Sequence, residues 1–258
     1  MRILLTNDDG IHAEGLAALE RIAAKLSDDV WVCAPEYEQS GASRALTLAE
    51  PIRVRKLSER KFATTGTPTD CVMLGVNELV SGAKPDLVLS GVNRGANLAE
   101  DVTMSGTVAG AIEAMALGLP GIALSQMGSY DPLDSFFEPA EAFAPGVIQK
   151  LIKVGWPREV VLNINFPATR IAEIGEVEVT RQGFRDVQVR IAEKRTDLRG
   201  RDYYWIGFRP EKSQPAEGTD LRALYEGRVS ITPLHIDLTH MATVHDLKKV
   251  MGGAPPRL

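Results

Sequence analysis

RILLTNDDG, residues 2–10, is a short apolar run that ends in two adjacent carboxylates, Asp8 and Asp9, and a glycine. The apolar residues after it recur at helical spacing, at Leu16, Leu19, Ile22, Ala23 and Leu26. A second apolar run, VWVCA at residues 30–34, stops at Pro35. A strand, a helix and a strand in this order form a βαβ unit, which predicts parallel pairing through a right-handed crossover.

The same alternation continues to about residue 170. Thr67, Pro68 and Asp70 mark the start of a helix that is expected to run to Leu79, because they suit its N-cap, its first position and its first turn. Further β-like runs lie at 52–57, 86–90, 121–125 and 160–166, and further helical patterns at 107–117 and 139–153. The sequence therefore predicts an alternating α/β core with a mostly parallel sheet over residues 1–170.

The pattern of the sequence changes after residue 170. Short alternating pieces, EVEVT (176–180), VQVRI (187–191) and YYWIGF (203–208), are separated by charged or glycine-containing turns and indicate β-hairpins. We expect residues 171–225 to form an extension that packs on the core or reaches a neighbouring subunit. Residues 226–258 are then expected to return to the core, with a strand at 229–236 and a closing helix near 243–251.

Composition bounds the class of protein. With 258 residues, 44% hydrophobic and 24% charged, the chain is typical of a soluble globular protein. The formal net charge of −5 argues against a nucleic-acid polymer as the main partner. No run approaches the length of a membrane span, the N-terminus lacks the pattern of a secretory signal, and Cys33 and Cys71 form no disulfide framework. We therefore expect a cytoplasmic protein without a membrane partner.

Asp8 and Asp9 follow the first predicted strand, at the edge where open parallel sheets bind ligands. Adjacent carboxylates repel each other, and a hard divalent cation bound by both would remove that repulsion. Oxygen ligands suit Mg²⁺ or Mn²⁺. An Asx-turn followed by a helix cap explains the same residues structurally, so the motif alone leaves both interpretations open.

Two further polar loops also follow predicted strands, QSGAS at 39–43 and SGVNRGAN at 90–97, and Ser105-Gly106-Thr107 begins a predicted helix. Hydroxyl and amide oxygens can complete a metal shell, and the N–H groups of glycine-bearing loops and helix starts favour phosphate. Each segment is also typical of an ordinary turn or N-cap. A shared site is favoured because all of these loops are expected to meet at one sheet edge.

Five motifs, in this order, resemble those of the SurE family, the stationary-phase survival proteins with 5′/3′-nucleotidase activity: NDDG (7–10), SGAS (40–43), GTPTDC (66–71), SGVNRGAN (90–97) and SGTVAGA (105–111). The resemblance extends to GTDLRALYEGRVSITPL at 218–234 and so covers the chain almost end to end. It implies a Rossmann-like α/β core whose C-terminal hairpin is exchanged between subunits, and hence a homo-oligomer, either a dimer or a tetramer.

The resemblance also implies roles for single residues. One divalent cation per subunit, Mg²⁺ or Mn²⁺, would be held by Asp8, Asp9, Ser40 and Asn93, with the two aspartates also assigned to catalysis. The phosphate group would be held by Asn97, Ser105, Gly106 and Thr107, with Ser43 nearby.

These roles predict hydrolysis of nucleoside 5′-monophosphates to nucleoside and phosphate, with 3′-monophosphates as further candidates. Water is the expected nucleophile, because the DxD spacing of an aspartyl-phosphate mechanism is absent from NDDG. Two alternatives stay open: a non-catalytic nucleotide-binding module and a metal-dependent N-glycoside hydrolase. The carboxylate pair argues against the first, since a pure phosphate binder gains nothing from two negative charges. The start of the helix at Ser105 argues against the second.

Overall fold

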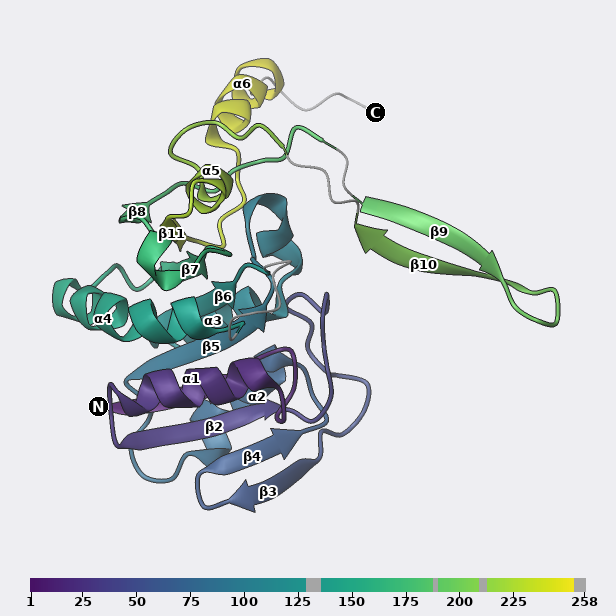
Figure 1. Cartoon of the computed structure of the whole chain (residues 1–258). Coiled ribbons are helices and arrows are strands. Elements are labelled where there is room, and N and C mark those ends of the chain that lie inside the picture. The colour runs from purple at the N-terminus through teal and green to yellow at the C-terminus, as the bar shows by residue number, and fades with distance from the viewer. Residues whose placement is uncertain (129–135, 188–189, 209–212, 253–258) are drawn as a thin grey trace.

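The chain was analysed as a computed structural model that describes residues 1–128, 136–187, 190–208 and 213–252. Within these ranges, nine strands form one sheet in the order β3-β4-β2-β1-β5-β6-β7-β11-β8 (Figure 1). Their bounds are Arg2–Thr6 (β1), Asp29–Pro35 (β2), Val54–Ser58 (β3), Lys61–Thr64 (β4), Leu87–Arg94 (β5), Gly121–Gln126 (β6), Val161–Phe166 (β7), Val177–Val179 (β8) and Val229–Leu234 (β11).

The strands from β4 to β7 in this order run parallel, whereas β3 and β11 run antiparallel to their neighbours β4 and β7. From β1 the chain moves first to β2 on one side and later to β5 on the other. In open parallel sheets such a reversal marks the place where ligands bind, which here is at the carboxyl ends of β1 and β5. The predicted mixed α/β fold with a mostly parallel sheet is confirmed.

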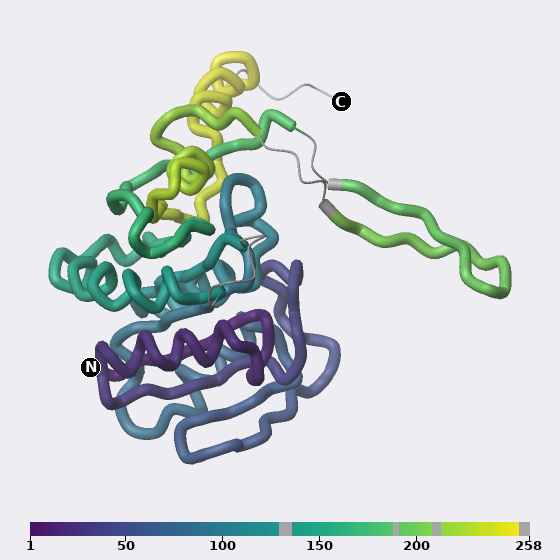
Figure 2. Tube along the Cα trace, viewed as in Figure 1, coloured from purple at the N-terminus to yellow at the C-terminus, as the bar shows by residue number. Residues whose placement is uncertain are grey.

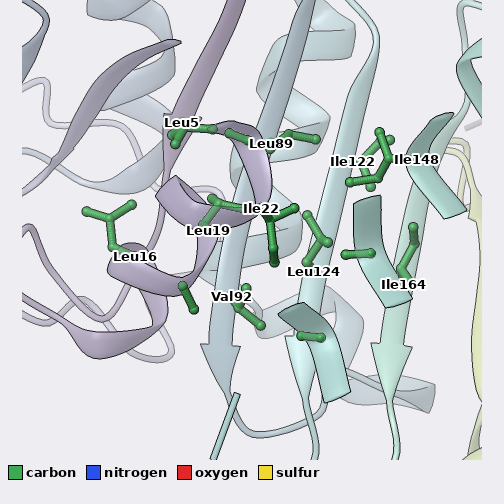
Figure 3. Close-up of a cluster of buried hydrophobic side chains, with 14 of the residues drawn as sticks. Leu5, Leu16, Leu19, Ile22, Leu89, Val92, Ile122, Leu124, Ile148 and Ile164 are labelled. Carbon is green, nitrogen blue, oxygen red and sulfur yellow. The ribbon is translucent and has the colours of Figure 1, made fainter. Parts of the chain in front are cut away.

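Helices cover both faces of the sheet (Figure 1). The helices α1 (Glu14–Ala24) and α4 (Glu138–Val154) lie on one face, and α2 (Pro68–Leu74) and α3 (Gly106–Ala116) lie on the other. Figure 3 shows Leu16, Leu19 and Ile22 of α1 packed on side chains of the central strands. Burial of this apolar stripe explains why the helical spacing in the sequence was informative.

The start of α2 matches the prediction. Thr67 accepts a hydrogen bond from the N–H of Asp70, and the Asp70 carboxylate accepts one from the N–H of Thr67, which together form a capping box. The α-helical part ends at Leu74, and a π-helical turn, Gly75–Leu79, completes the expected span. Strand β4 was missed because its sequence, KFAT, is too short to show periodicity.

The C-terminal part contains a separate hairpin, β9 (Arg190–Thr196) paired antiparallel with β10 (Asp202–Phe208). It projects away from the body of the molecule, as the Cα trace in Figure 2 also shows. Residues 188–189 of the expected strand VQVRI lie outside the described residues. The expected piece EVEVT forms β8, which joins the main sheet beside β11 instead of a hairpin.

The remaining helices are α5 (Asp220–Tyr225), α6 (Met241–Met251) and two 3₁₀ turns, Ala99–Met104 and Ile171–Glu173. Helix α5 lies within the segment predicted as an extension, yet Leu221 and Leu224 pack with Leu98 and Ala99 of the core. The division of the chain at residues 170 and 225 stays a prediction. Among the described residues, none of the helices combines the length and apolar content of a membrane span.

Gly15 tests the close contact between α1 and β5. A Cβ at Gly15 would lie 2.0 Å from the carbonyl oxygen of Val92. We expect Gly15→Ala to lower the free energy of unfolding by about 2–3 kcal/mol, because backbone must move to admit the methyl group. A Cβ at Gly146 of α4 would meet no described atom within 4 Å apart from its chain neighbours and the backbone of its own helix, so Gly146→Ala should instead raise the free energy of unfolding by about 0.5–1 kcal/mol. Chemical denaturation measures the free energy of unfolding of both variants. An unchanged free energy of unfolding in Gly15→Ala would contradict the close contact between α1 and β5.

Candidate active site

The structure brings the predicted polar loops to one edge of the sheet. The N–H of Gln39, in the loop after β2, donates to the carbonyl oxygen of Asp8 at 2.7 Å. The N–H of Arg94, at the end of β5, donates to Asp9 Oδ2 at 3.2 Å. The Thr107 hydroxyl of α3 donates to Asp8 Oδ1 at 2.5 Å. The loops after β1, β2 and β5 and the start of α3 therefore meet around the aspartate pair.

Asp8 is buried against the first turn of α3. Its side chain accepts the bond from Thr107, and the residue is only 4% exposed. A Cβ on Gly106 would lie 2.8 Å from the Cβ of Asp8 and 2.9 Å from its Oδ2. Glycine at position 106 thus lets the helix N-terminus approach the carboxylate of Asp8. Any residue with a Cβ at this position would displace that side chain.

The environment disfavours negative charge on both aspartates. Burial raises the pKa of Asp8 from its ordinary value of 3.8 to about 6, with repulsion from Asp9 adding to the rise and the bond from Thr107 opposing it. Burial also raises the pKa of Asp9, and the nearby Glu38 carboxylate adds to this rise, while the N–H of Arg94 opposes it. A cation between these groups would relieve the cost of holding them ionised.

Ser40 lies in the loop after β2, and Asn93 directly precedes Arg94, whose N–H bonds to Asp9. The Ser40 hydroxyl donates to Glu38 Oε1 at 2.7 Å, and Ser40 lines the same cavity of about 390 Å³ as Asp9 and Glu38. The amide nitrogen of Asn93 donates to the carbonyl oxygen of Gly95 at 2.8 Å, so its amide oxygen points away from Gly95. Sequence reasoning missed Glu38, an acid two residues before the SGAS loop whose charge acts on Asp9.

The donor chemistry fits a hard divalent cation. Among the described residues, no three His, Cys, Asp or Glu side chains form a cluster able to hold a metal. A cation here would therefore need neutral hydroxyl or amide oxygens beside the two carboxylates, and such oxygens suit Mg²⁺ and Mn²⁺. The buried Asn7 Oδ1 also lacks a hydrogen-bond partner in the described part of the chain, so acceptor capacity is left unused next to the pair.

The start of α3 resembles an anion site. Ser105 is the N-cap, and its hydroxyl accepts from the N–H of Val108 at 3.0 Å. The N–H groups of the first helical turn have no acceptor within the helix and carry its positive dipole. Ser43 is held beside this turn by a 2.8 Å bond from its hydroxyl to the carbonyl oxygen of Thr103. Ser43 and Ser105 line one cavity of about 220 Å³.

Asn97 is bonded to the sheet rather than to α3. Its amide nitrogen donates to Ser125 Oγ at 2.8 Å, and its backbone is bonded by the side chains of Asn163 and Asn165 on β7. The sequence analysis predicted a strand at residues 160–166, VVLNINF, and assigned no role to its two asparagines. Two amides at alternate positions of an otherwise apolar strand were the signal that could have identified them.

Comparison with known proteins decides the family. A family model described as "Survival protein SurE" matches residues 3–189. The chain belongs to the SurE family. This membership confirms the resemblance seen in the NDDG, SGAS and SGVNRGAN motifs.

Similar proteins match along nearly their whole length. The "5′-nucleotidase SurE" of Phenylobacterium zucineum (strain HLK1) is 77% identical over 258 residues and covers all of both chains. The protein of the same name from Caulobacter vibrioides (strain NA1000 / CB15N) is 71% identical over 259 residues, with 100% of this chain and 98% of the relative covered. The crystal structure of the SurE protein from Aquifex aeolicus is 40% identical with a TM-score of 0.83, and the match covers 97% of this chain and 100% of that one.

The raised pKa of Asp8 predicts a stability cost in the metal-free protein. Because the pKa is about 6 in the folded state and near 3.8 when unfolded, the folded carboxyl holds its proton more tightly. Stability is therefore lost as the pH rises from about 4 to about 6, and the loss persists above that range. We expect Asp8→Asn to raise the free energy of unfolding by about 3 kcal/mol at pH 7.5, with no gain below about pH 4.

Asp220 provides the matched comparison. Burial also raises its pKa, but its carboxylate accepts three backbone hydrogen bonds, from Ala99, Gly183 and Leu221. Asp220→Asn should lower stability, because an amide nitrogen turned toward one of these N–H groups cannot accept its bond. Urea unfolding with chelator present, repeated across pH 4–8, measures both variants. Destabilisation of the metal-free protein by Asp8→Asn at pH 7.5 would contradict the charge argument.

Proposed function

We propose that this protein hydrolyses nucleoside 5′-monophosphates to nucleoside and phosphate with the help of one divalent cation. Relatives at 77% and 71% identity over the whole chain are named 5′-nucleotidase SurE. The observation that carries the proposal is the 2.5 Å bond from Thr107 to Asp8, which joins the carboxylate pair to the first turn of α3. An anion at this helix start would lie beside a cation held by the pair.

Asp8, Asp9, Ser40 and Asn93 would hold the cation, with Glu38 adding negative charge from the same cavity. When bound, the cation supplies positive charge against the phosphoryl oxygens and makes water a better nucleophile. The Thr107 hydroxyl holds one oxygen of Asp8 and so restrains the orientation of this carboxylate. Asp9 is less buried than Asp8 and lines the open cavity, so it is the carboxylate assigned to accept a proton from the attacking water.

The phosphate would bind at the start of α3, to the N–H groups of Gly106 and Thr107, with Ser43, Ser105 and Asn97 around it. Helix N-termini favour anions because their N–H groups lack internal acceptors and their dipole is positive. The same groups would offset the charge that develops on the phosphoryl oxygens during transfer to water. The product phosphate keeps these contacts, so inorganic phosphate is expected to inhibit the reaction.

The activity test uses AMP and other 5′- and 3′-monophosphates with Mg²⁺ or Mn²⁺. We expect phosphate release that chelation abolishes and added metal restores. Asp8→Asn and Asp9→Asn should each lower kcat by about a hundredfold or more, because each removes a charged ligand of the proposed cation. Colorimetric phosphate release measures turnover, and chromatography of the other product distinguishes nucleoside from free base.

Asp28→Asn is the control variant. Asp28 is an exposed aspartate between α1 and β2, so its loss should change kcat by less than about twofold. Release of free base would favour the N-glycoside hydrolase, and nucleotide binding without any product would favour the non-catalytic module. Turnover that survives chelation, or full activity of Asp8→Asn, would contradict the metal-dependent mechanism.

We also infer that the β9–β10 hairpin joins subunits into a homo-oligomer. The hairpin projects from the body, and it carries large apolar side chains that are exposed in the single chain, among them Tyr204 at 61% and Ile206 at 74%. A soluble protein rarely leaves such a group of side chains uncovered. Exchange of a projecting element between identical chains covers it at little cost.

Substitution on one face of β10 tests this inference. Tyr204 and Ile206 lie on the same face of the strand, so Tyr204→Ser combined with Ile206→Ser removes one apolar stripe. We expect the double variant to lower the mass measured by light scattering. Val154→Ser is the control, because Val154 is 84% exposed at the end of α4, away from the hairpin. A double variant with the mass of the wild type would contradict the inference.

A further inference from the structure

Asn97 is attached to β7 by both of its backbone polar groups. Its N–H donates to Asn165 Oδ1 at 2.9 Å, and its carbonyl oxygen accepts from Asn165 Nδ2 at 3.1 Å. The same carbonyl oxygen accepts a second bond from Asn163 Nδ2 at 2.8 Å. We propose that Asn163 and Asn165 are positioning residues that set the side chain of Asn97 for the phosphate group, an inference that rests on the proposed function.

The carboxamide of Asn165 takes the place of a strand partner. A backbone residue in a ladder offers one N–H and one carbonyl, and the Asn165 side chain satisfies both from Asn97. The loop that follows β5 therefore gains sheet-like pairing without being a strand. Because all three bonds go to backbone groups, they leave the side chain of Asn97 available for another ligand.

The side chain of Asn97 is fixed by the neighbouring strand. Its amide nitrogen donates to Ser125 Oγ at 2.8 Å, and Ser125 on β6 lies directly opposite Asn165 on β7. An amide nitrogen carries two hydrogens, so the second remains for an anion. The backbone of Asn97 is thus held from β7 and its side chain from β6, which leaves little freedom of orientation.

Asparagine is an unfavourable residue at these two positions of the sheet, which indicates that Asn163 and Asn165 are there to hold the loop at Asn97. Their neighbours in β7 are Val161, Leu162, Ile164 and Phe166, all buried and apolar. Asparagine is depleted in strands, and a buried amide is costly unless it is fully bonded. Asn163 Oδ1 is buried with no hydrogen-bond partner among the described residues. An apolar side chain would avoid that cost but could not hold Asn97.

Substitutions of Asn165 test the proposal. Asn165→Leu removes two of the three bonds, and Asn165→Asp keeps an acceptor for the Asn97 N–H but places a carboxylate against its carbonyl oxygen. We expect each to raise KM for AMP and the inhibition constant of inorganic phosphate by about tenfold, with kcat changed by less than about threefold. The Mn²⁺ concentration for half-maximal activity should stay within about twofold, because the proposed metal ligands are untouched.

The strand beside β7 supplies matched controls. Ser230 and Thr232 of β11 lie opposite Asn165 and Asn163, are equally buried, and bond to Thr180 rather than to the loop. Ser230→Ala and Thr232→Val should lower the melting temperature while KM stays within about twofold of the wild type. A rise in KM in these variants equal to that in the Asn165 variants would overturn the proposal, because loosening of the sheet would then explain both.

A binding measurement separates this proposal from the proposed function. The rise in melting temperature caused by inorganic phosphate, measured with Mn²⁺ present, reports phosphate binding without turnover. Loss of this rise in Asn165→Leu, but not in Ser230→Ala, supports positioning even if the wild type hydrolyses no nucleotide. An equal rise in both would overturn it even if the wild type is an active nucleotidase. If Asn165→Leu does not fold, Asn163→Leu, which removes one bond, should lose part of the rise, and a full rise would again overturn the proposal.

Discussion

The placement of two neighbouring carboxylates at the end of the central strand is the constraint on which the rest of the site depends. Asp8 is buried against α3, and its side chain accepts a hydrogen bond from the Thr107 hydroxyl of that helix. The helix can come this close because position 106 is glycine. A longer side chain there would separate the negative pair from the positive helix N-terminus, and the proposed cation and phosphate would no longer lie side by side.

Burying the two aspartates destabilises the folded protein, and the packing of the helices on the sheet offsets this loss. Burial raises the pKa of both aspartates, so the folded protein holds charge where it is disfavoured. The apolar packing of α1 and α4 on one face of the sheet and of α2 and α3 on the other supplies the opposing stabilisation. Stability is spread through the core, whereas the destabilising charge lies at one edge of the sheet.

Local signals and long-range contacts differ in how far the sequence reveals them. The capping box at Thr67, the run before Asp8 and the Ser105 cap were predictable because each depends on residues a few positions apart. Strand β4 was not, because four residues show no period and its pairing with β2 is long-range. The partners of Asn97 were not either, since Asn163 and Asn165 lie more than sixty residues away along the chain.

The strands beside β5 fix both ends of the loop that carries Asn97. Asn93 pairs with Ser125 of β6, and the side chain of Asn97 donates to the hydroxyl of the same Ser125. The backbone of Asn97 is bonded by the side chains of Asn163 and Asn165, which project from β7. Among the described residues, the loop between Asn93 and Asn97 makes no ladder of its own beyond β5, so these contacts with the two neighbouring strands hold Asn97 in place. The position of Asn97 is thus set by the sheet as well as by the loop.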